Sequence, residues 1–220
     1  MTACGFFMMK IEDGETIEDK ILFDVINKMD SNVDRATRII NNMREFARKS
    51  GMDIGKIQVN EVIERAFEFF SQQMKLREIN VVWEIQEDLP KIKADSSQLE
   101  QVFINLFLNA RDAIEQRWGS QKPAASEKRI TIKSEFDGDK VICQVCDTGI
   151  GVQESLKDKV FEPFFTTKEV GKGMGLGLSI SYGIVKEFDG SIRVSSNDPE
   201  GACFILEFPV AEKNNEDNGK

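Results

Sequence analysis

Apolar side chains recur along residues 17–49 at steps that alternate between four and three residues. This heptad spacing is typical of a coiled-coil helix, so we predict one long helix over residues 16–49. A narrow apolar seam needs a partner helix, which would come from a second copy of the chain or from a segment outside it. Packing of the helix on its own domain is the alternative. The seam positions are Leu22, Ile26, Met29, Val33, Ala36, Ile40, Met43 and Ala47.

A different pattern begins after Ser50 and Gly51, which are typical of a helix end. Helical periodicity then alternates with the period-two pattern of half-buried strands. Ser97 and Glu100 have the spacing of a capping box at a helix start. The predicted helices cover residues 59–77, 95–115 and 178–188, and the predicted strands cover 81–85, 130–136, 140–147, 191–196 and 202–209.

This succession of elements predicts an α/β two-layer sandwich, in which one mixed sheet carries helices on one face. The long coiled-coil-type helix precedes it. We therefore divide the chain into a helical region over residues 1–50, an α/β domain over residues 51–210 and a polar tail over residues 211–220.

The charge balance limits the partners of the chain. Its net charge is −9, and a nucleic-acid partner is not expected because the phosphate backbone needs clustered Lys and Arg. No apolar run approaches the length of a membrane span, and residues 1–9 lack the basic leader of a signal peptide. These features predict a cytoplasmic location without membrane contact by this segment.

The cysteines do not have the pattern of a metal site. Cys143 and Cys146 form a single C-x-x-C pair, and the chain contains no histidine. A zinc site would need a second pair or histidines. The pair also stands in a predicted strand, where residues three apart point to opposite faces. We expect reduced thiols that behave as small buried hydrophobes.

Three polar residues form a stripe along the predicted helix 95–115. Asn105, Asn109 and Asp112 lie on one helical face and are surrounded by apolar positions. Asparagine is unfavourable there unless its amide has a partner. An amide oxygen suits Mg²⁺ beside phosphates, and the alternative is that these amides make buried hydrogen bonds only.

Two further segments are rich in glycine. Strand 140–147 leads directly into Asp147-x-Gly149-x-Gly151, and alternation places Asp147 on the covered face of the sheet. A buried carboxylate needs a donor partner, for which the exocyclic amine of a base is a candidate. Segment 171–178 leads straight into a helix, where backbone N–H groups bind phosphate.

Between these segments, residues 161–168 read Phe-Glu-Pro-Phe-Phe-Thr-Thr-Lys. Phenylalanines in a connecting segment indicate a lid that covers a pocket. Lys168 and Lys172 are basic residues in an acidic chain and are placed to meet phosphates. Solvated surface lysines are the alternative interpretation.

In this order, the motifs resemble the GHKL class of ATP-binding domains, with the Bergerat fold, and within it the bacterial sensor histidine kinases. The resemblance covers residues 56–209. Helix 17–49 is similar to the second helix of the dimerisation and phosphoacceptor hairpin of these kinases. The matching motifs are the N box at 105–113, the G1 box at 147–151, the F box at 161–168, the G2 box at 171–178 and the final Gly-x-x-Phe element at 201–204.

The resemblance implies a role for each motif residue. Asn109 would ligate Mg²⁺, Asn105 would contact phosphate, and Asp147 would read the adenine amine. Residues 152–172 would form the ATP lid. The implied catalytic residues are Asn105, Asn109 and Lys168. The implied nucleotide-binding residues are Asn105, Asn109, Asp112, Asp147, Gly149, Ile150, Gly151, Phe164, Lys168, Gly171, Lys172, Gly173, Gly175, Leu176, Gly177 and Leu178.

One position separates kinases from hydrolytic members of the class. In gyrase-type ATPases, a Glu four residues before the Mg²⁺-binding Asn activates the attacking water. Here that residue is Asn105, whose amide cannot accept a proton. Glu100 lies on the opposite side of the helix from Asn109, so it cannot serve as the base in place of the missing glutamate. Asp112 stands where similar kinases often carry a phosphate-binding lysine.

The resemblance implies a sensor histidine kinase that uses ATP and Mg²⁺, is homodimeric in its full-length form and relays its phosphoryl group to a response-regulator receiver domain. Because this chain has no histidine, we interpret it as a fragment that lacks the acceptor. Two alternatives are a related serine or anti-sigma kinase and a nucleotide-binding scaffold without catalysis. The heptad helix disfavours the compact anti-sigma type, and the intact N-box asparagines and glycines disfavour the scaffold.

Overall fold

The computed structural model describes residues 9, 12–13, 20–29, 32, 53–119, 127–168, 175–197 and 201–211. The contacts between Cα atoms divide the chain into two units, Met1–Met52 and Asp53–Lys220. In the first unit, residues 20–29 are helical and Leu22 and Ile26 of the predicted seam are exposed. Most of the remaining heptad helix lies outside the described residues.

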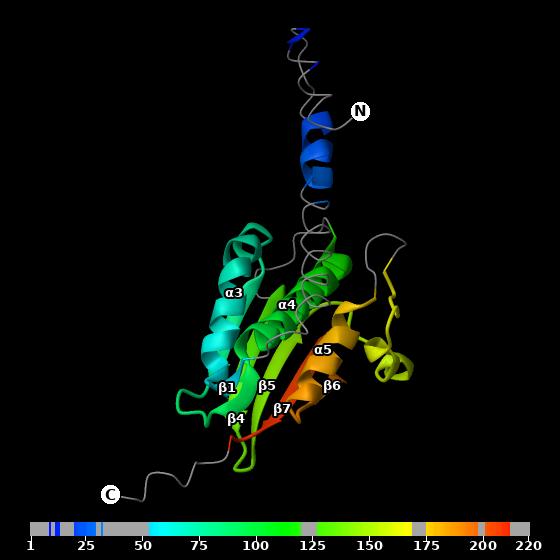
Figure 1. Cartoon of the computed structure of the whole chain (residues 1–220). Coiled ribbons are helices and arrows are strands. Elements are labelled where there is room, and N and C mark those ends of the chain that lie inside the picture. The colour runs from blue at the N-terminus through cyan, green and yellow to red at the C-terminus, as the bar shows by residue number, and fades with distance from the viewer. Residues whose placement is uncertain are drawn as a thin grey trace, which may run out of the picture. The chain divides into compact units, whose positions relative to one another are not determined.

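The second unit contains a mixed sheet (Figure 1). Its five strands lie in the order β2-β4-β5-β7-β6. β2 runs parallel to β4, and every other neighbouring pair is antiparallel. The strands are β2 (Asn80–Ile85), β4 (Arg129–Phe136), β5 (Lys140–Asp147), β7 (Ala202–Pro209) and β6 (Ser191–Ser196).

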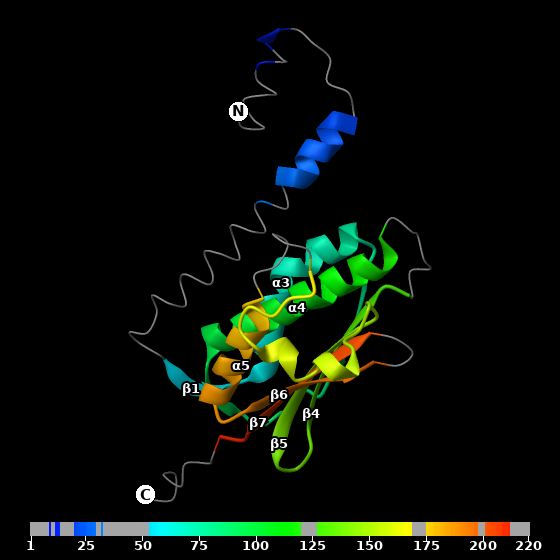
Figure 2. The same ribbon diagram turned by 90° about the vertical axis from the view of Figure 1, so that its right-hand side faces the viewer.

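Helices α3 (Val59–Leu76), α4 (Ser96–Trp118) and α5 (Gly177–Glu187) cover one face of this sheet (Figure 2). Phe103 and Phe107 of α4 are fully buried in the core between the layers. Full burial of such a side chain contributes about 1.5–3 kcal/mol. The predicted two-layer sandwich, one mixed sheet with helices on one face, is therefore confirmed. None of the described helices combines the length and apolar character that a membrane crossing requires.

A second, smaller sheet was not predicted. β1 (Ile54–Ile57) pairs antiparallel with β3 (Ile92–Asp95), and Ile57 lies opposite Ile92. Each strand has only four residues. Such short segments carry too few alternating positions to give a strand signal.

The start of α4 differs from the predicted capping box. The N-cap is Asp95, whose Oδ1 accepts hydrogen bonds from the backbone N–H groups of Ser97 at 2.9 Å and Gln98 at 3.1 Å. The Ser97 hydroxyl also donates to this oxygen at 2.6 Å. The capping-box prediction is therefore wrong, because β3 ends at Asp95 and a carboxylate there satisfies the first free N–H groups of the helix.

Candidate functional site

Asp147 ends β5 on the face that the helices cover, as predicted. Its side chain is 1 % exposed. Oδ1 accepts hydrogen bonds from the backbone N–H groups of Gly149 at 2.8 Å and Ala202 at 3.4 Å. Oδ2 makes no hydrogen bond with the described residues. Burial raises the pKa of this carboxyl to about 6, so at neutral pH it remains an acceptor with one free oxygen.

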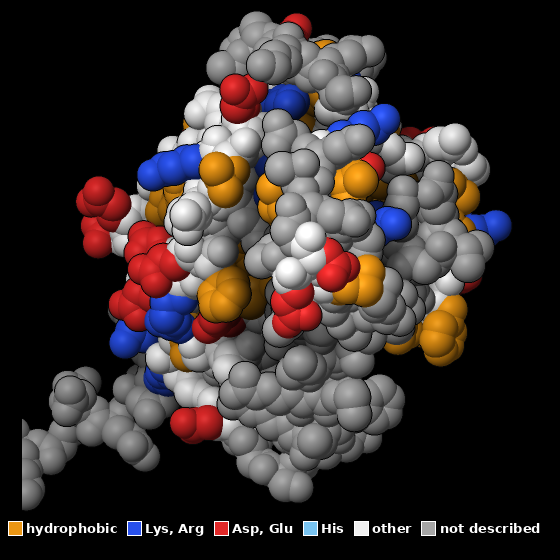
Figure 3. All heavy atoms as spheres, turned by 90° about the horizontal axis from the view of Figure 1, so that it is seen from above, with side chains coloured by type: hydrophobic (Ala, Val, Ile, Leu, Met, Phe, Trp, Pro, Cys, Tyr) orange, Lys and Arg blue, Asp and Glu red, His pale blue; other side chains and the backbone are white. Residues whose placement is uncertain are grey.

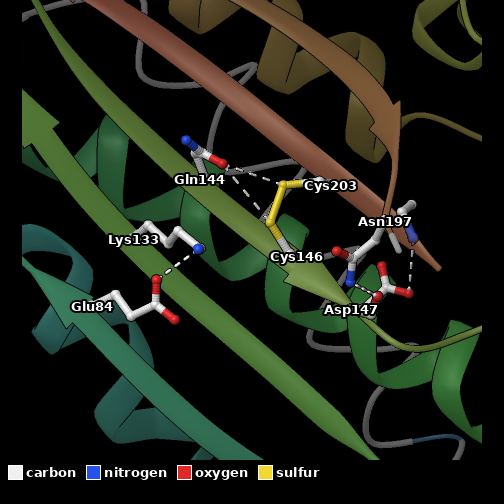
Figure 4. The surroundings of a disulfide bond; sticks show 8 residues. Glu84, Lys133, Gln144, Cys146, Asp147, Asn197 and Cys203 are labelled. Atoms are coloured by element: carbon white, nitrogen blue, oxygen red, sulfur yellow. Dashed lines mark hydrogen bonds and ion pairs between the residues drawn. A yellow bond between two sulfur atoms is a disulfide. The ribbon is translucent and has the colours of Figure 1, made fainter. Parts of the chain in front are cut away.

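The main chain of Asp147 is held from the other side by the β6–β7 connection. Asn197 donates its side-chain N–H to the Asp147 carbonyl oxygen at 2.7 Å (Figure 4). Gly201 packs so closely that a Cβ atom there would lie 1.9 Å from the same oxygen. Asn197 was missed in the sequence, because a lone Asn after a strand is typical of any turn.

The G1 box lies directly against α4. A Cβ atom on Gly149 would lie 2.5 Å from the carbonyl carbon of Ala113, and the Ile150 N–H donates to the Ala113 carbonyl at 3.3 Å. Gly151 has a φ of +72°, which favours glycine. Gly149 is therefore required for close packing on α4, whereas Gly151 is required for its backbone conformation.

The two N-box asparagines differ in their surroundings, although both are half-buried. Asn105 donates through Nδ2 to the Gly177 carbonyl and to the Ser181 hydroxyl, both at 3.3 Å, and so joins α4 to α5. The Asn109 amide makes no hydrogen bond with any residue of the described ranges. Asn105 thus makes the protein hydrogen bonds that the alternative interpretation of the N box predicts. The Asn109 amide remains available to a ligand.

Asp112 connects the N box to the F box. Its Oδ2 lies 2.5 Å from Nζ of Lys168, and its Oδ1 lies 2.8 Å from Nη2 of Arg111. Arg111 also donates to Gln73 of α3 at 3.0 Å. Burial by itself raises the pKa of Asp112, but the positive charges of Lys168 and Arg111 bring it below its ordinary value.

The first turn of α5 lies at the end of the glycine-rich segment, as predicted. Leu176 stands at the N-cap, and its apolar side chain cannot accept a hydrogen bond from the free N–H groups of this turn. Leu178 packs on the main core. Gly175 has a φ of +66°, and a Cβ atom on it would lie 2.5 Å from the carbonyl carbon of Phe164. Gly171, Lys172 and Gly173 lie outside the described residues.

The described part of the predicted lid contains two short 3-10 helices, η1 (Glu154–Leu156) and η2 (Lys159–Phe161). The Phe161 ring lies 5.7 Å from Tyr182 of α5 and 6.4 Å from Phe204 of β7, between ring centroids. Phe164 is 75 % exposed and has a φ of +67°. Phe161 therefore anchors the segment, while a nucleotide contact by Phe164 stays a prediction.

The cysteines depart from expectation in one respect. Cys143 and Cys146 point to opposite faces of the sheet, as predicted, and the described residues contain no metal-binding group of three or more His, Cys, Asp or Glu side chains. However, Cys146 forms a disulfide with Cys203 (Figure 4). The prediction of reduced thiols is wrong for these two, because the β5–β7 register places them directly opposite each other.

The face of the domain that Figure 3 draws adds little to this picture. On the face drawn in Figure 3, acidic, basic and hydrophobic side chains are interspersed. The site is therefore defined by the contacts around α4 and the end of β5.

Comparison with known proteins gives one family. The family model described as "Histidine kinase-, DNA gyrase B-, and HSP90-like ATPase" matches residues 94–212. The chain is 34 % identical over 203 residues to the sensor kinase CckA of Brucella abortus, and the match covers 88 % of this chain and 21 % of that protein. It is 33 % identical over 182 residues to the sensor histidine kinase ZraS of Escherichia coli K12, which covers 83 % of this chain and 37 % of that protein. The chain thus spans well under half the length of these relatives.

Solved structures show the same architecture. The nucleotide-free catalytic domain of histidine kinase ThkA matches with a TM-score of 0.62 and 33 % identity, over 73 % of this chain and all of that domain. The structure of ThkA in complex with the response regulator protein TrrA matches with a TM-score of 0.66 and 29 % identity, over 96 % of this chain and 57 % of that chain.

Proposed function

Because this chain belongs to the histidine kinase-, DNA gyrase B-, and HSP90-like ATPase family, and within it to the sensor histidine kinases, we propose that it binds ATP with Mg²⁺ and transfers the γ-phosphoryl group to a histidine. The chain itself contains no histidine, so the acceptor stands on another polypeptide or segment.

The observation that carries this proposal is the convergence of three motifs on one helix. The G1 box packs against α4 at Ala113. The F box contacts α4 through the ion pair between Lys168 and Asp112. The first turn of α5 contacts α4 through the hydrogen bond from the Asn105 amide to the Gly177 carbonyl. Segments that are far apart in sequence thus meet along two turns of α4, beside the free amide of Asn109.

The end of β5 supplies the base-binding group. The free Oδ2 of Asp147 accepts a hydrogen bond from the exocyclic amine of adenine, while Oδ1 stays on the N–H groups of Gly149 and Ala202. A guanine base presents a carbonyl at the corresponding position, which a carboxylate repels. This pairing therefore favours adenine nucleotides.

The phosphate-binding groups are the amide of Asn109, the N-terminus of α5 and Lys168. Asn109 would be the protein ligand of Mg²⁺, and the bound ion would supply positive charge to offset that of the phosphates. The N–H groups of the first turn of α5 attract anions through the helix dipole. Lys168 already lies on the same side of α4, held by Asp112. Lys172, Gly171 and Gly173 extend this set by sequence.

The site contains no base for water activation at the position that hydrolytic relatives use. Asn105 stands there, and its amide N–H groups donate to Gly177 and Ser181. An amide oxygen cannot take the proton of an attacking water at neutral pH. This supports phosphoryl transfer to a side chain rather than rapid hydrolysis.

The relatives also support a proposal for the partners of the whole protein. The ThkA complex contains a response regulator protein, and we propose that a receiver domain accepts the phosphoryl group from the acceptor histidine. Homodimerisation through the helix of residues 16–49 and a cytoplasmic location belong to this proposal as well.

The first test is titration of the purified chain with a non-hydrolysable ATP analogue, with and without Mg²⁺. We expect saturable binding that Asp147→Asn weakens strongly at all Mg²⁺ concentrations. Asn109→Ala should instead remove most of the dependence on Mg²⁺. Asp137→Asn is the matched control, because Asp137 also accepts backbone N–H hydrogen bonds but lies in the turn between β4 and β5, at the other end of β5 from Asp147.

The second test supplies a separate two-helix hairpin that carries a histidine, together with ATP. Acid-labile phosphate on that histidine is the expected product, and Asn109→Ala should abolish it. Absence of nucleotide binding in a folded wild-type chain would refute the proposal. Binding without transfer to the hairpin would favour the non-catalytic scaffold.

A further inference from the structure

The disulfide of Cys146 and Cys203 stands beside the proposed adenine-binding group but on the opposite face of the sheet. Cys146 immediately precedes Asp147, and Cys203 immediately follows Ala202, which donates its N–H to Asp147. The two cysteines are direct partners in the β5–β7 ladder and form its last pair. Figure 4 shows the disulfide and the Asp147 side chain next to each other along β5.

We infer that Cys146 and Cys203 form a redox-sensitive site, at which thiol–disulfide exchange with low-molecular-weight disulfides and thiols controls the nucleotide affinity of the domain. The disulfide state holds Asp147 in its binding arrangement, and the dithiol state binds the nucleotide more weakly. The inference rests on the proposed function, because it assigns nucleotide binding to Asp147.

The position of the pair explains how it acts without touching the ligand. Successive residues of a strand point to opposite faces, so the sulfur atoms lie away from the helices while Asp147 and Ala202 face the site. A covalent link at the last ladder pair restricts the separation of β5 and β7 at this end. The Ala202 N–H to Asp147 Oδ1 contact, at 3.4 Å, is the long one of the two that hold the carboxylate. It is therefore the contact that a small strand separation would break first.

The exchange is selective for this pair. Cys143 lies on the helix-facing side, is fully buried in the main core and has Leu206 as its ladder partner on β7. Burial also raises the pKa of the Cys143 thiol to about 12, so it forms almost no thiolate. Cys146 and Cys203, by contrast, belong to a small cluster with Ile205 and Ile142 on the other face of the sheet.

The surroundings of the two cysteines determine the rate of thiol–disulfide exchange. Cys146 and Cys203 are 5 % and 6 % exposed, so only small reagents reach the sulfur atoms. Gln144 brings an amide oxygen to 3.6 Å from Cys203 Sγ, which does not stabilise a thiolate. Lys133, on the neighbouring strand, pairs with Glu84 at 2.6 Å. Because Lys133 is already paired with a carboxylate, we expect slow exchange that follows sustained redox conditions.

The chemistry is ordinary disulfide exchange. The thiolate of one cysteine attacks a small disulfide, forms a mixed disulfide and releases one small thiolate. The second cysteine attacks the protein sulfur of the mixed disulfide and releases the second small thiolate. Two protein thiols are oxidised, one small disulfide is reduced to two thiols, and the two cysteine protons pass to the released thiolates through solvent.

The test uses the whole chain, equilibrated in buffers of glutathione and glutathione disulfide. Alkylation followed by mass spectrometry gives the fraction of oxidised pair, and titration with the ATP analogue gives the affinity of each state. We expect the reduced chain to bind about fivefold more weakly than the oxidised chain, at the lower end of common couplings between two sites. Wild-type protein in both states suffices, so the result does not depend on any variant that fails to fold.

Thermodynamic linkage provides an independent readout. If oxidation tightens nucleotide binding fivefold, saturating nucleotide must stabilise the disulfide by the same factor. For a two-electron couple this lowers the midpoint potential of the pair by about 20 mV. Cys146→Ser and Cys203→Ser should each bind like the reduced wild type in every buffer, whereas Cys4→Ser should keep the full response.

Equal affinity of the oxidised and reduced chains would overturn the inference while leaving the proposed function intact. So would a pair that stays reduced in glutathione disulfide. Failure of the proposed function gives a different result, in which neither redox state binds the nucleotide and Asp147→Asn changes nothing.

Discussion

Nζ of Lys168 lies 2.5 Å from Oδ2 of Asp112, and this ion pair connects the end of the F box to helix α4. The same carboxylate receives the guanidinium of Arg111, whose side chain is only 4 % exposed. Asp112 thus neutralises one buried positive charge, on Arg111, and one more exposed positive charge, on Lys168. Loss of the Asp112 carboxylate should therefore cost more at Arg111 than at Lys168.

We predict that Asp112→Asn lowers the free energy of unfolding by roughly 1–3 kcal/mol, because the buried guanidinium of Arg111 loses the carboxylate that lies 2.8 Å away. Lys168→Met is the matched control and should cost about 1 kcal/mol or less, since it removes only the more exposed partner. Urea denaturation of both variants measures the difference. Equal losses in the two variants would contradict this view of Arg111.

The pH dependence of this stabilisation has a defined sign. The pKa of Asp112 is lowered in the folded chain, so its contribution is fully present above the ordinary Asp value of 3.8 and is lost only as the pH falls through the lowered value. The stability difference between wild type and Asp112→Asn should therefore be constant from pH 5 to 8.

Nucleotide binding should weaken as the pH falls through about 6. The pKa of Asp147 is raised to about 6 by burial, and its protonated form replaces an acceptor with a donor that faces the adenine amine. We expect the affinity for the ATP analogue to fall about tenfold for each pH unit below this value. Calorimetric titration from pH 5 to 8 tests it, and an affinity that is flat over this range would contradict the assigned role of Asp147.

Asp147→Asn should raise stability while it weakens binding. The folded chain holds a proton on Asp147 between pH 3.8 and about 6 that the unfolded chain has released. Stability therefore falls as the pH rises through this window, and the burial of the charge costs at most about 3 kcal/mol at pH 7. The neutral Asn variant avoids this cost. Thermal unfolding at pH 4 and pH 7 should show a gain for the variant at pH 7 that disappears at pH 4.

Gly201→Ala should be strongly destabilising. The new Cβ would lie 1.9 Å from the Asp147 carbonyl oxygen, and the φ of +121° is unfavourable for alanine. We expect a loss of about 2–4 kcal/mol together with weaker nucleotide binding, since the backbone of Asp147 must shift. Gly183→Ala is the control, because nothing lies within 4 Å of its Cβ position in α5 and alanine should stabilise that helix by about 0.5–1 kcal/mol. A stable, binding-competent Gly201→Ala chain would contradict the close packing.

The main elements of the fold could be predicted because each one carries enough residues to show its period. Strands β6 and β7 begin and end at the predicted residues, and α4 differs from prediction by a few residues at its C-terminal end. The small β1–β3 sheet could not be predicted, since Ile54–Ile57 contains a glycine and each strand is only four residues long. Propensity alone says little about segments of this length.

Candidate site residues could be selected from the sequence where their chemistry conflicts with their position, as for Asp147 at the end of an apolar strand or Asn109 on an apolar helix. Contacts that depend on register could not be predicted. Cys146 and Cys203 are 57 residues apart and meet only because β7 pairs with β5. Lys168 and Asp112 are likewise 56 residues apart, and no local pattern indicates their ion pair.

The strand order has a consequence for synthesis on the ribosome. Among the five strands of the described sheet, β7 is translated last, yet it lies between β5 and β6. Until it emerges, β5 has no partner on that side, and Asp147 lacks the Ala202 N–H that comes 55 residues later. A nascent chain should therefore be unable to hold adenine until β7 has left the exit tunnel, so nucleotide binding would report the assembly of this sheet.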